Sequence, residues 1–135
     1  MSCPYRSWNL IGAAVLAEAC AIAEEPVTAA MTERFQTALR QAQPFARGCA
    51  DHLADCDVAN IEDPLTQPEL VGAEALWQFM AGEAAVLESR LYCWLRIGAR
   101  PDWADKALLF ALEQYVYRMI AEEIIWRRQR QHRAA

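Results

Sequence analysis

Turn-forming residues are scarce in this chain, and their scarcity limits what it can fold into. The 135 residues include five glycines and six prolines, the two residue types that most often interrupt regular structure. Between them the sequence is rich in Ala, Leu, Glu, Gln and Arg, which are strong helix formers, and poor in β-branched residues. We therefore predict an all-α protein. A chain of this length fits one compact domain, so residues 1–135 are expected to form a single helical domain.

Apolar residues recur at three- and four-residue steps in four long segments, which is the spacing of one helix face. In the third segment, for example, the repeat runs through Leu76, Met80, Ala84 and Leu87. The four predicted helices cover residues 7–25, 27–53, 69–97 and 101–131. Long helices of similar length predict an antiparallel four- to five-helix bundle.

Prolines and glycines mark the predicted interruptions. Pro44 lacks an N–H and clashes with the carbonyl four residues earlier, so we expect the second helix to be broken near Pro44. Gly98 is expected to cap the third helix, and Pro101 to open the fourth with Asp102 in its first turn. Residues 54–68 have no helical period and contain two prolines, which predicts a long loop.

Charge is distributed unevenly along the chain. Residues 1–123 hold all 18 acidic residues and nine of the 13 basic ones, a net charge of −9, whereas residues 124–135 hold four arginines and no acid, a net charge of +4. This basic helix end is either a solvated terminus whose cations suit the helix dipole or a surface that contacts a partner, protein or nucleic acid. The partner-binding residues predicted there are Trp126, Arg127, Arg128, Arg130 and Arg133.

The stretch RGCADHLADCD, residues 47–57, is the strongest candidate for chemistry. On a continuous helix, Cys49, His52 and Cys56 share one face, and two thiolates with an imidazole are a known zinc set. Ligands at i and i+7 are, however, about 10 Å apart along a helix axis, too far for one tetrahedral ion. We therefore predict an ordinary helix face there, with no metal and no cofactor.

Aromatic residues are more numerous in the last two predicted helices than one buried face can hold. Their spacing cannot turn all of them inward, and large exposed apolar patches mark interfaces, most often those of two-fold dimers. We therefore predict a homodimer. The predicted interface residues are Trp77, Phe79, Tyr92, Trp94, Phe110 and Tyr117.

Two segments, SRLYCWLR (89–96) and FALEQYVYRM (110–119), resemble the last two helices of ATP:cob(I)alamin adenosyltransferases, which are helical bundles. The matching positions are Arg90, Cys93, Leu112 and Tyr115. The resemblance implies a bundle that binds a cofactor or nucleotide. The family's N-terminal phosphate-binding segment and its Asn-Arg-Leu-Ser-Asp stretch have no counterpart in this sequence, so the activity is not carried over.

The leading functional hypothesis is a non-enzymatic interaction protein: an inhibitor, immunity factor, adaptor or small subunit of a larger assembly. The chain has no glycine-rich phosphate loop and no Glu-x-x-His motif. The alternatives are a nucleic-acid-associated subunit that uses the basic C-terminus, and a helical-bundle enzyme that binds a cofactor or nucleotide. Five cysteines without a Cys-x-x-Cys pair favour reduced thiols, so we expect a bacterial-like cytoplasmic protein. The uncharged run over residues 7–17 is far shorter than the roughly 20 residues that span a bilayer, so we expect no membrane contact.

Overall fold

The computed structural model describes residues 8–53 and 74–134, and every regular element within those ranges is an α-helix. The prediction of an all-α protein is confirmed. The helices are α1 (Trp8–Ile22), α2 (Ala29–His52), α4 (Glu74–Gly82), α5 (Ala84–Leu95) and α6 (Trp103–Ala134). The loop predicted over residues 54–68 lies outside the described residues. Within the described part, none of the helices combines the length and apolar character needed to cross a membrane.

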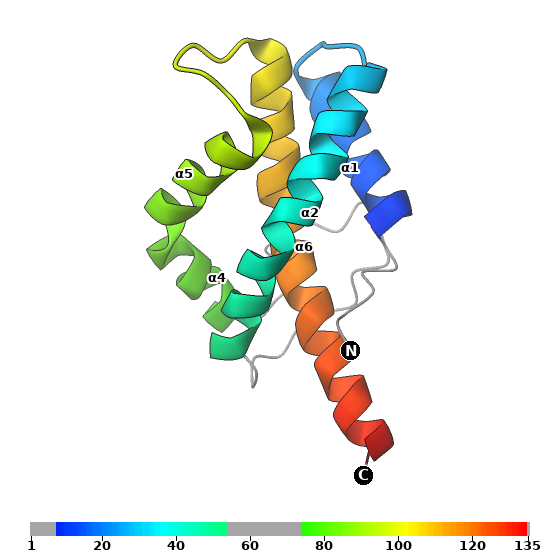
Figure 1. Cartoon of the computed structure of the whole chain (residues 1–135), viewed down its shortest axis with the longest axis vertical. Helices are drawn as coiled ribbons and strands as arrows, with labels where there is room; N and C mark the ends of the chain where they lie inside the picture. Colours follow the sequence, from blue (N-terminus) through cyan, green and yellow to red (C-terminus); the bar gives the residue numbers. More distant parts are fainter. Residues whose placement is uncertain (1–7, 54–73, 135) are drawn as a thin grey trace.

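Helix α6 is the centre of the arrangement. In Figure 1, α1 and α2 run in opposite directions, α4 and α5 follow the direction of α1, and α6 returns alongside α2. Both α1 and α2 pack mainly on α6 and only lightly on each other, while α5 packs on α2 and α6. The wide apolar arc of the last predicted helix is explained by this central position, because three neighbours cover it.

A ridge of small side chains brings α2 close to α6. Four alanines at four-residue steps on α2 are fully buried, and Ala107 and Ala111 are buried on α6. We call the α2 residues the alanine ridge; they are Ala38, Ala42, Ala46 and Ala50. Short side chains let two helix backbones approach closely, and interiors of this kind are packed as densely as organic crystals. The larger residues Leu108, Leu112 and Met119 fill the core beside the ridge.

Pro44 lies inside α2 without dividing it. The helix is continuous from Ala29 to His52, so the predicted break near Pro44 is wrong. The reason is visible in the burial pattern: Pro44 is exposed, whereas Ala42 and Ala46 on either side are held against α6. Packing holds residues on both sides of Pro44, and Arg40, whose carbonyl loses its hydrogen bond at Pro44, is exposed, so water can satisfy that carbonyl.

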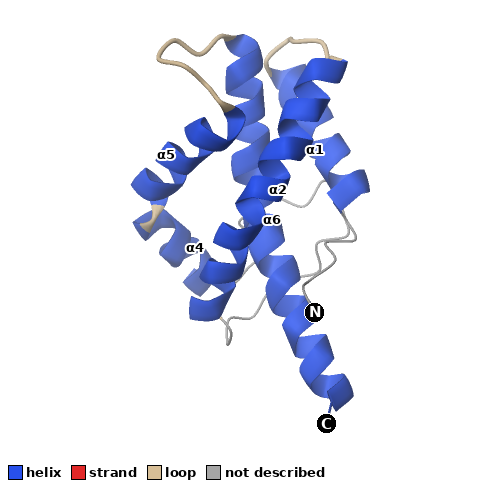
Figure 2. Ribbon diagram, viewed as in Figure 1, coloured by secondary structure: helices blue, strands red, loops and turns tan. Residues whose placement is uncertain are grey.

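The helix predicted over residues 69–97 is instead interrupted between α4 and α5, at the turn drawn in tan in Figure 2. The N–H of Glu83 is shared between the carbonyls of Phe79 and Met80, at 3.1 and 3.2 Å. Gly82 immediately precedes it, and glycine is the poorest helix former after proline. The low helix propensity of Gly82 ends α4 here, because Gly82 is exposed and has no side chain that packs on the core.

Helices α2 and α6 each begin with a side-chain cap, and both caps are residue types preferred at helix N-termini. Thr28 precedes α2, and its hydroxyl accepts a hydrogen bond from the Met31 N–H at 3.1 Å. Asp102 precedes α6: it accepts from the Asp105 N–H at 2.7 Å, while Asp105 accepts from the Asp102 N–H at 3.2 Å. This reciprocal pair is a capping box. Asp102 is thus the cap of α6 and not a member of its first turn.

Helices α1 and α5 end in left-handed residues that are not glycine. Glu24 and Arg96 have φ of 57° and 56°. After α5, the Arg96 N–H donates to the Cys93 carbonyl at 3.2 Å and the Ile97 N–H to the Tyr92 carbonyl at 3.0 Å, the pattern of a Schellman motif. The capping role predicted for Gly98 belongs to Arg96, and Gly98 has no positive φ.

Candidate interaction surface on helix α6

Two large aromatic side chains lie open on the outer face of the first half of α6. Trp103 is 62% exposed and Phe110 is 46% exposed. They are seven positions apart, so they project from the same side of the helix. Lys106 and Glu113 are also exposed on this side. We call Trp103, Lys106, Phe110 and Glu113 the aromatic stripe.

Electrostatics give the aromatic stripe a basic end and an acidic end. The Lys106 Nζ lies 4.4 Å from the centroid of the Trp103 ring, a cation–π contact. At the other end, loss of solvation and then the nearby charge of Glu88 on α5 raise the pKa of Glu113. The stripe therefore has a positive charge beside Trp103 and a negative charge beyond Phe110.

The same face of α6 becomes buried about one turn after Glu113. Tyr117 is 7% exposed, and Ala121 and Ile124 are fully buried. Burial, and after it the charge of Glu113, raises the pKa of Tyr117. The aromatic stripe is therefore bounded by the start of the helix at one end and by Tyr117 at the other.

The structure places the predicted interface residues in several environments. Phe79 is half-buried and stacks on His52, with ring centroids 5.9 Å apart. Trp94 is half-buried with its ring edge against Phe45, at 5.7 Å between centroids. Tyr92 is half-buried, Tyr117 is buried, and the side chain of Trp77 lies outside the described residues.

Among the predicted interface residues whose side chains the structure describes, Phe110 is the exposed one. Trp103 is also exposed but was not among the predicted interface residues. A signal for Trp103 was present. Asp102 caps α6, which makes Trp103 the first helical residue, and the seven-residue step to Phe110 puts both on one side.

Arg127, predicted to bind a partner, is half-buried and engaged by groups of its own chain. Its Nη1 lies 2.7 Å from Asp51 on α2, its Nε 3.1 Å from Glu123, and its Nη2 3.3 Å from the Arg47 carbonyl. Glu123 is only 2% exposed. We call this set the Arg127 clamp; it joins α6 to the C-terminal end of α2 and compensates a buried carboxylate.

The remaining predicted residues of the basic end differ from one another in exposure. Trp126 is half-buried against the core, and the guanidinium of Arg130 lies 5.3 Å from the centroid of its ring. Arg128 is half-buried and Arg130 is exposed. The Arg133 side chain lies outside the described residues. Figure 1 shows the last turns of α6 extending beyond the end of α2.

Of the candidate metal face, Cys49 and His52 lie in the last turn of α2, which ends at His52 before Leu53 leaves the helical conformation. Cys49 is buried, and burial, then the charge of Glu83, raise the pKa of its thiol to about 11, against a lowering effect of Arg90. The thiol is thus neutral at neutral pH, the form that neither binds metal nor attacks. His52 is exposed, and Cys56 lies outside the described residues. In the part of the chain the structure describes, no three His, Cys, Asp or Glu side chains gather into a metal-binding group.

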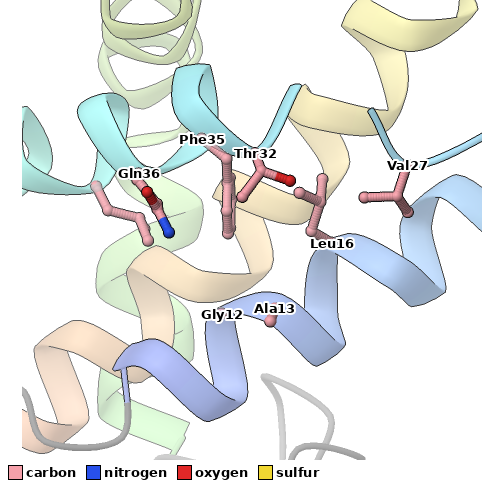
Figure 3. Close-up of a pocket in the computed structure, with 8 residues that line it drawn as sticks. Gly12, Ala13, Leu16, Val27, Thr32, Phe35 and Gln36 are labelled. Atoms are coloured by element: carbon pink, nitrogen blue, oxygen red, sulfur yellow. The ribbon is translucent and has the colours of Figure 1, made fainter. Parts of the chain in front are cut away.

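A shallow apolar pocket lies between α1 and α2, where these helices pack lightly on each other (Figure 3). Its lining residues are Gly12, Ala13, Leu16, Val27, Thr32, Phe35, Gln36 and Leu39. The Thr32 hydroxyl donates to the Thr28 carbonyl at 3.1 Å, so it is engaged by its own helix. With no ionisable group in its lining, the pocket suits an apolar group and offers no acid–base chemistry.

Comparison with protein families, with characterised proteins and with solved structures found no match to this chain. The positions that resemble the adenosyltransferases lie in different environments. Leu112 and Tyr115 are core residues, Cys93 is exposed, and Arg90 lies over the Phe45 ring at 5.6 Å. These four positions do not form one site, so the resemblance to the adenosyltransferases stays a prediction.

Proposed function

We propose that the chain is a single-domain antiparallel helical bundle that acts in the cytoplasm as a non-enzymatic interaction protein, and that the aromatic stripe is its contact surface. The observation that carries this proposal is the exposure of Trp103 and Phe110 on one side of α6. Inhibitors, immunity factors, adaptors and small subunits all work through such surfaces.

The chemistry of the aromatic stripe suits protein contact. Large aromatic side chains are enriched at the centres of interfaces, because they bury much apolar area and lose little conformational entropy. Each exposed square ångström of apolar surface that a partner covers contributes about 25 cal/mol of gross stabilisation. The charges of Lys106 and Glu113 on either side of Phe110 supply orientation, which is the usual role of charged groups at the edge of an interface.

Site-specific photocrosslinking tests the proposal. A photoreactive phenylalanine analogue at position 110 is expected to form a specific covalent adduct with a partner in cells that express the chain naturally. The same analogue at Glu33, an exposed residue of α2, is the matched control and should form none. Absence of any adduct from position 110, or identical adducts from both positions, would contradict the proposal.

The projecting end of α6 favours a second candidate function, nucleic-acid contact through Arg128 and Arg130. Arg130 is exposed at that end, and arginines bind phosphates with an affinity that falls as salt rises. Fluorescence anisotropy with a single-stranded oligonucleotide should show salt-dependent binding that the double variant Arg128→Ser, Arg130→Ser lacks. Equal anisotropy for both proteins at low salt would remove this candidate.

A further inference from the structure

We propose that the partner seated on the aromatic stripe is a second copy of this chain, with the two α6 helices antiparallel about a two-fold axis beside Phe110. The inference rests on the proposed function, because it takes the aromatic stripe to be the contact surface. It adds the identity and the orientation of the partner.

The order of charges along α6 selects the orientation. Lys106 precedes Phe110 by about one turn and Glu113 follows it by about one turn, both exposed. Parallel helices in register would set Lys106 against Lys106 and Glu113 against Glu113. An antiparallel pair with its axis midway between residues 106 and 113 sets each Lys106 beside the Glu113 of the other copy, so that two opposite-charge contacts form at once.

The apolar residues agree with the same axis. The midpoint of residues 106 and 113 lies between Leu109 and Phe110, so the two exposed Phe110 rings meet at the axis. Trp103 of each copy then reaches the level of residues 116–117 of the other, where the open face ends at Tyr117. The aromatic stripe is therefore self-complementary in length, apolar character and charge, as an isologous interface requires.

The isolated chain also leaves a repulsion that this pairing relieves. Glu113 is close enough to Glu88 on α5 for the two negative charges to interact unfavourably. A Lys106 from the second copy supplies the opposite charge at that place. Lys106 is exposed and touches Trp103 in its own chain, so reaching a second copy requires no unfolding.

Light scattering after size exclusion at micromolar concentration gives the first measurement, with twice the chain mass expected. The single variants Lys106→Glu and Glu113→Lys each place like charges at both contacts, and each should raise the dissociation constant of the dimer at least tenfold. An equimolar mixture of the two variants should form a heterodimer, since every contact then joins opposite charges. The control Glu33→Lys changes the charge equally on the exposed side of α2 and should leave the dimer intact.

Orientation is tested by disulfide formation in a Cys93→Ser background, which removes an exposed thiol. Phe110→Cys is expected to link two copies, whereas Trp103→Cys is not, because antiparallel helices place the two positions 103 about 20 Å apart. Linking at both positions would overturn the antiparallel arrangement. A dimer that ignores the charge variants would show that another surface is used.

The remaining outcomes separate the inference from the proposed function. A monomer whose position 110 crosslinks to a different protein overturns self-pairing and leaves the proposed function standing. A monomer that forms no crosslink from position 110 overturns both.

Discussion

Two consecutive stretches of α6, residues 103–114 and residues 115–124, belong to one continuous helix but are organised in opposite ways. In the first, open stretch, Trp103 and Phe110 point to solvent on one side while the other sides are covered. In the second, closed stretch, nearly every residue is buried, and two charged residues, Arg118 and Glu123, are buried with it at 4% and 2% exposure. Apolar side chains lie outside where the helix is open, and charged ones lie inside where it is closed.

The difference shows that burial along a helix follows its neighbours and not only its own sequence. Charge can be buried in the closed stretch because each charged group has a partner there. Glu123 accepts from Arg127, and the Arg118 Nη1 donates to the Gln114 carbonyl at 3.2 Å. Buried charges without such partners are costly, so these contacts are a condition for closing the helix.

The largest expected effect compares the two stretches directly. Ile120 is fully buried in the closed stretch, so Ile120→Ala should lower the free energy of unfolding by about 3 kcal/mol through lost burial and a cavity. Phe110→Ala in the open stretch should lower it by less than about 1 kcal/mol. Urea unfolding followed by circular dichroism in dilute protein measures both. Equal losses would mean that the two stretches are packed alike.

The next effect concerns the Arg127 clamp. Replacing Arg127 by Met keeps much of the apolar stem but leaves the buried Glu123 carboxylate without its arginine, so we expect a loss of about 2–3 kcal/mol. Arg40→Met removes the same charge from an exposed position of α2 and is the matched control, with an expected change of about 0.5 kcal/mol or less. Thermal or urea unfolding compares them. A control as damaging as Arg127→Met would show that overall charge, and not the clamp, stabilises this end.

Alkaline pH should destabilise the closed end through Cys49, which lies on α2 two residues before Asp51 of the clamp. Its pKa is raised from 9.0 to about 11 by burial and by Glu83, against a lowering effect of Arg90, so its contribution is complete below pH 9 and is lost as pH rises toward 11. The stability difference between wild type and Cys49→Ala should shrink by about 1–2 kcal/mol over that range. Cys93→Ala removes an exposed thiol and is the matched control. Parallel curves for both cysteines would contradict the prediction.

The smallest effect belongs to the open end. Glu113→Gln removes the repulsion with Glu88 and should stabilise the monomer by about 0.3 kcal/mol at pH 7, as expected for one exposed like-charge pair. The gain should vanish at pH 3, below the raised pKa of Glu113, where that carboxyl carries no charge. The same variant should weaken the dimer, because it removes a partner of Lys106. A gain that persists at pH 3 would assign the effect to something other than charge.

Helical periodicity was sufficient to predict the fold class and the approximate extents of the helices, because the apolar residues face a common core. It failed at two interruptions. Pro44 is a strong local breaker, but the alanine ridge packs on both sides of it and keeps α2 whole. Gly82 is a weaker breaker that was overlooked, and without a buried side chain to oppose it the helix turns there.

The candidate site was harder to predict because it depends on which helices are neighbours. Trp94 and Phe79 were assigned to an outer face, but contacts with Phe45 and His52 on α2 half-bury them. Arg127 looked like part of a basic end free to bind a partner, and only the position of α2 brings Asp51 to it across 76 residues of sequence. Spacing along one helix carries no information about such pairs.

The alanine ridge has a consequence for how this sequence can change over time. Ala38, Ala42 and Ala46 are completely buried, so a larger residue at any of these positions is expected to move α2 away from α6 unless a side chain opposite becomes smaller. Substitutions on α2 and α6 therefore depend on each other, and most single substitutions of these alanines by a larger residue should be destabilising. Descendants of this sequence should either keep the small residues or exchange volume between α2 and α6 in pairs, which would appear in relatives as covariation between these two helices.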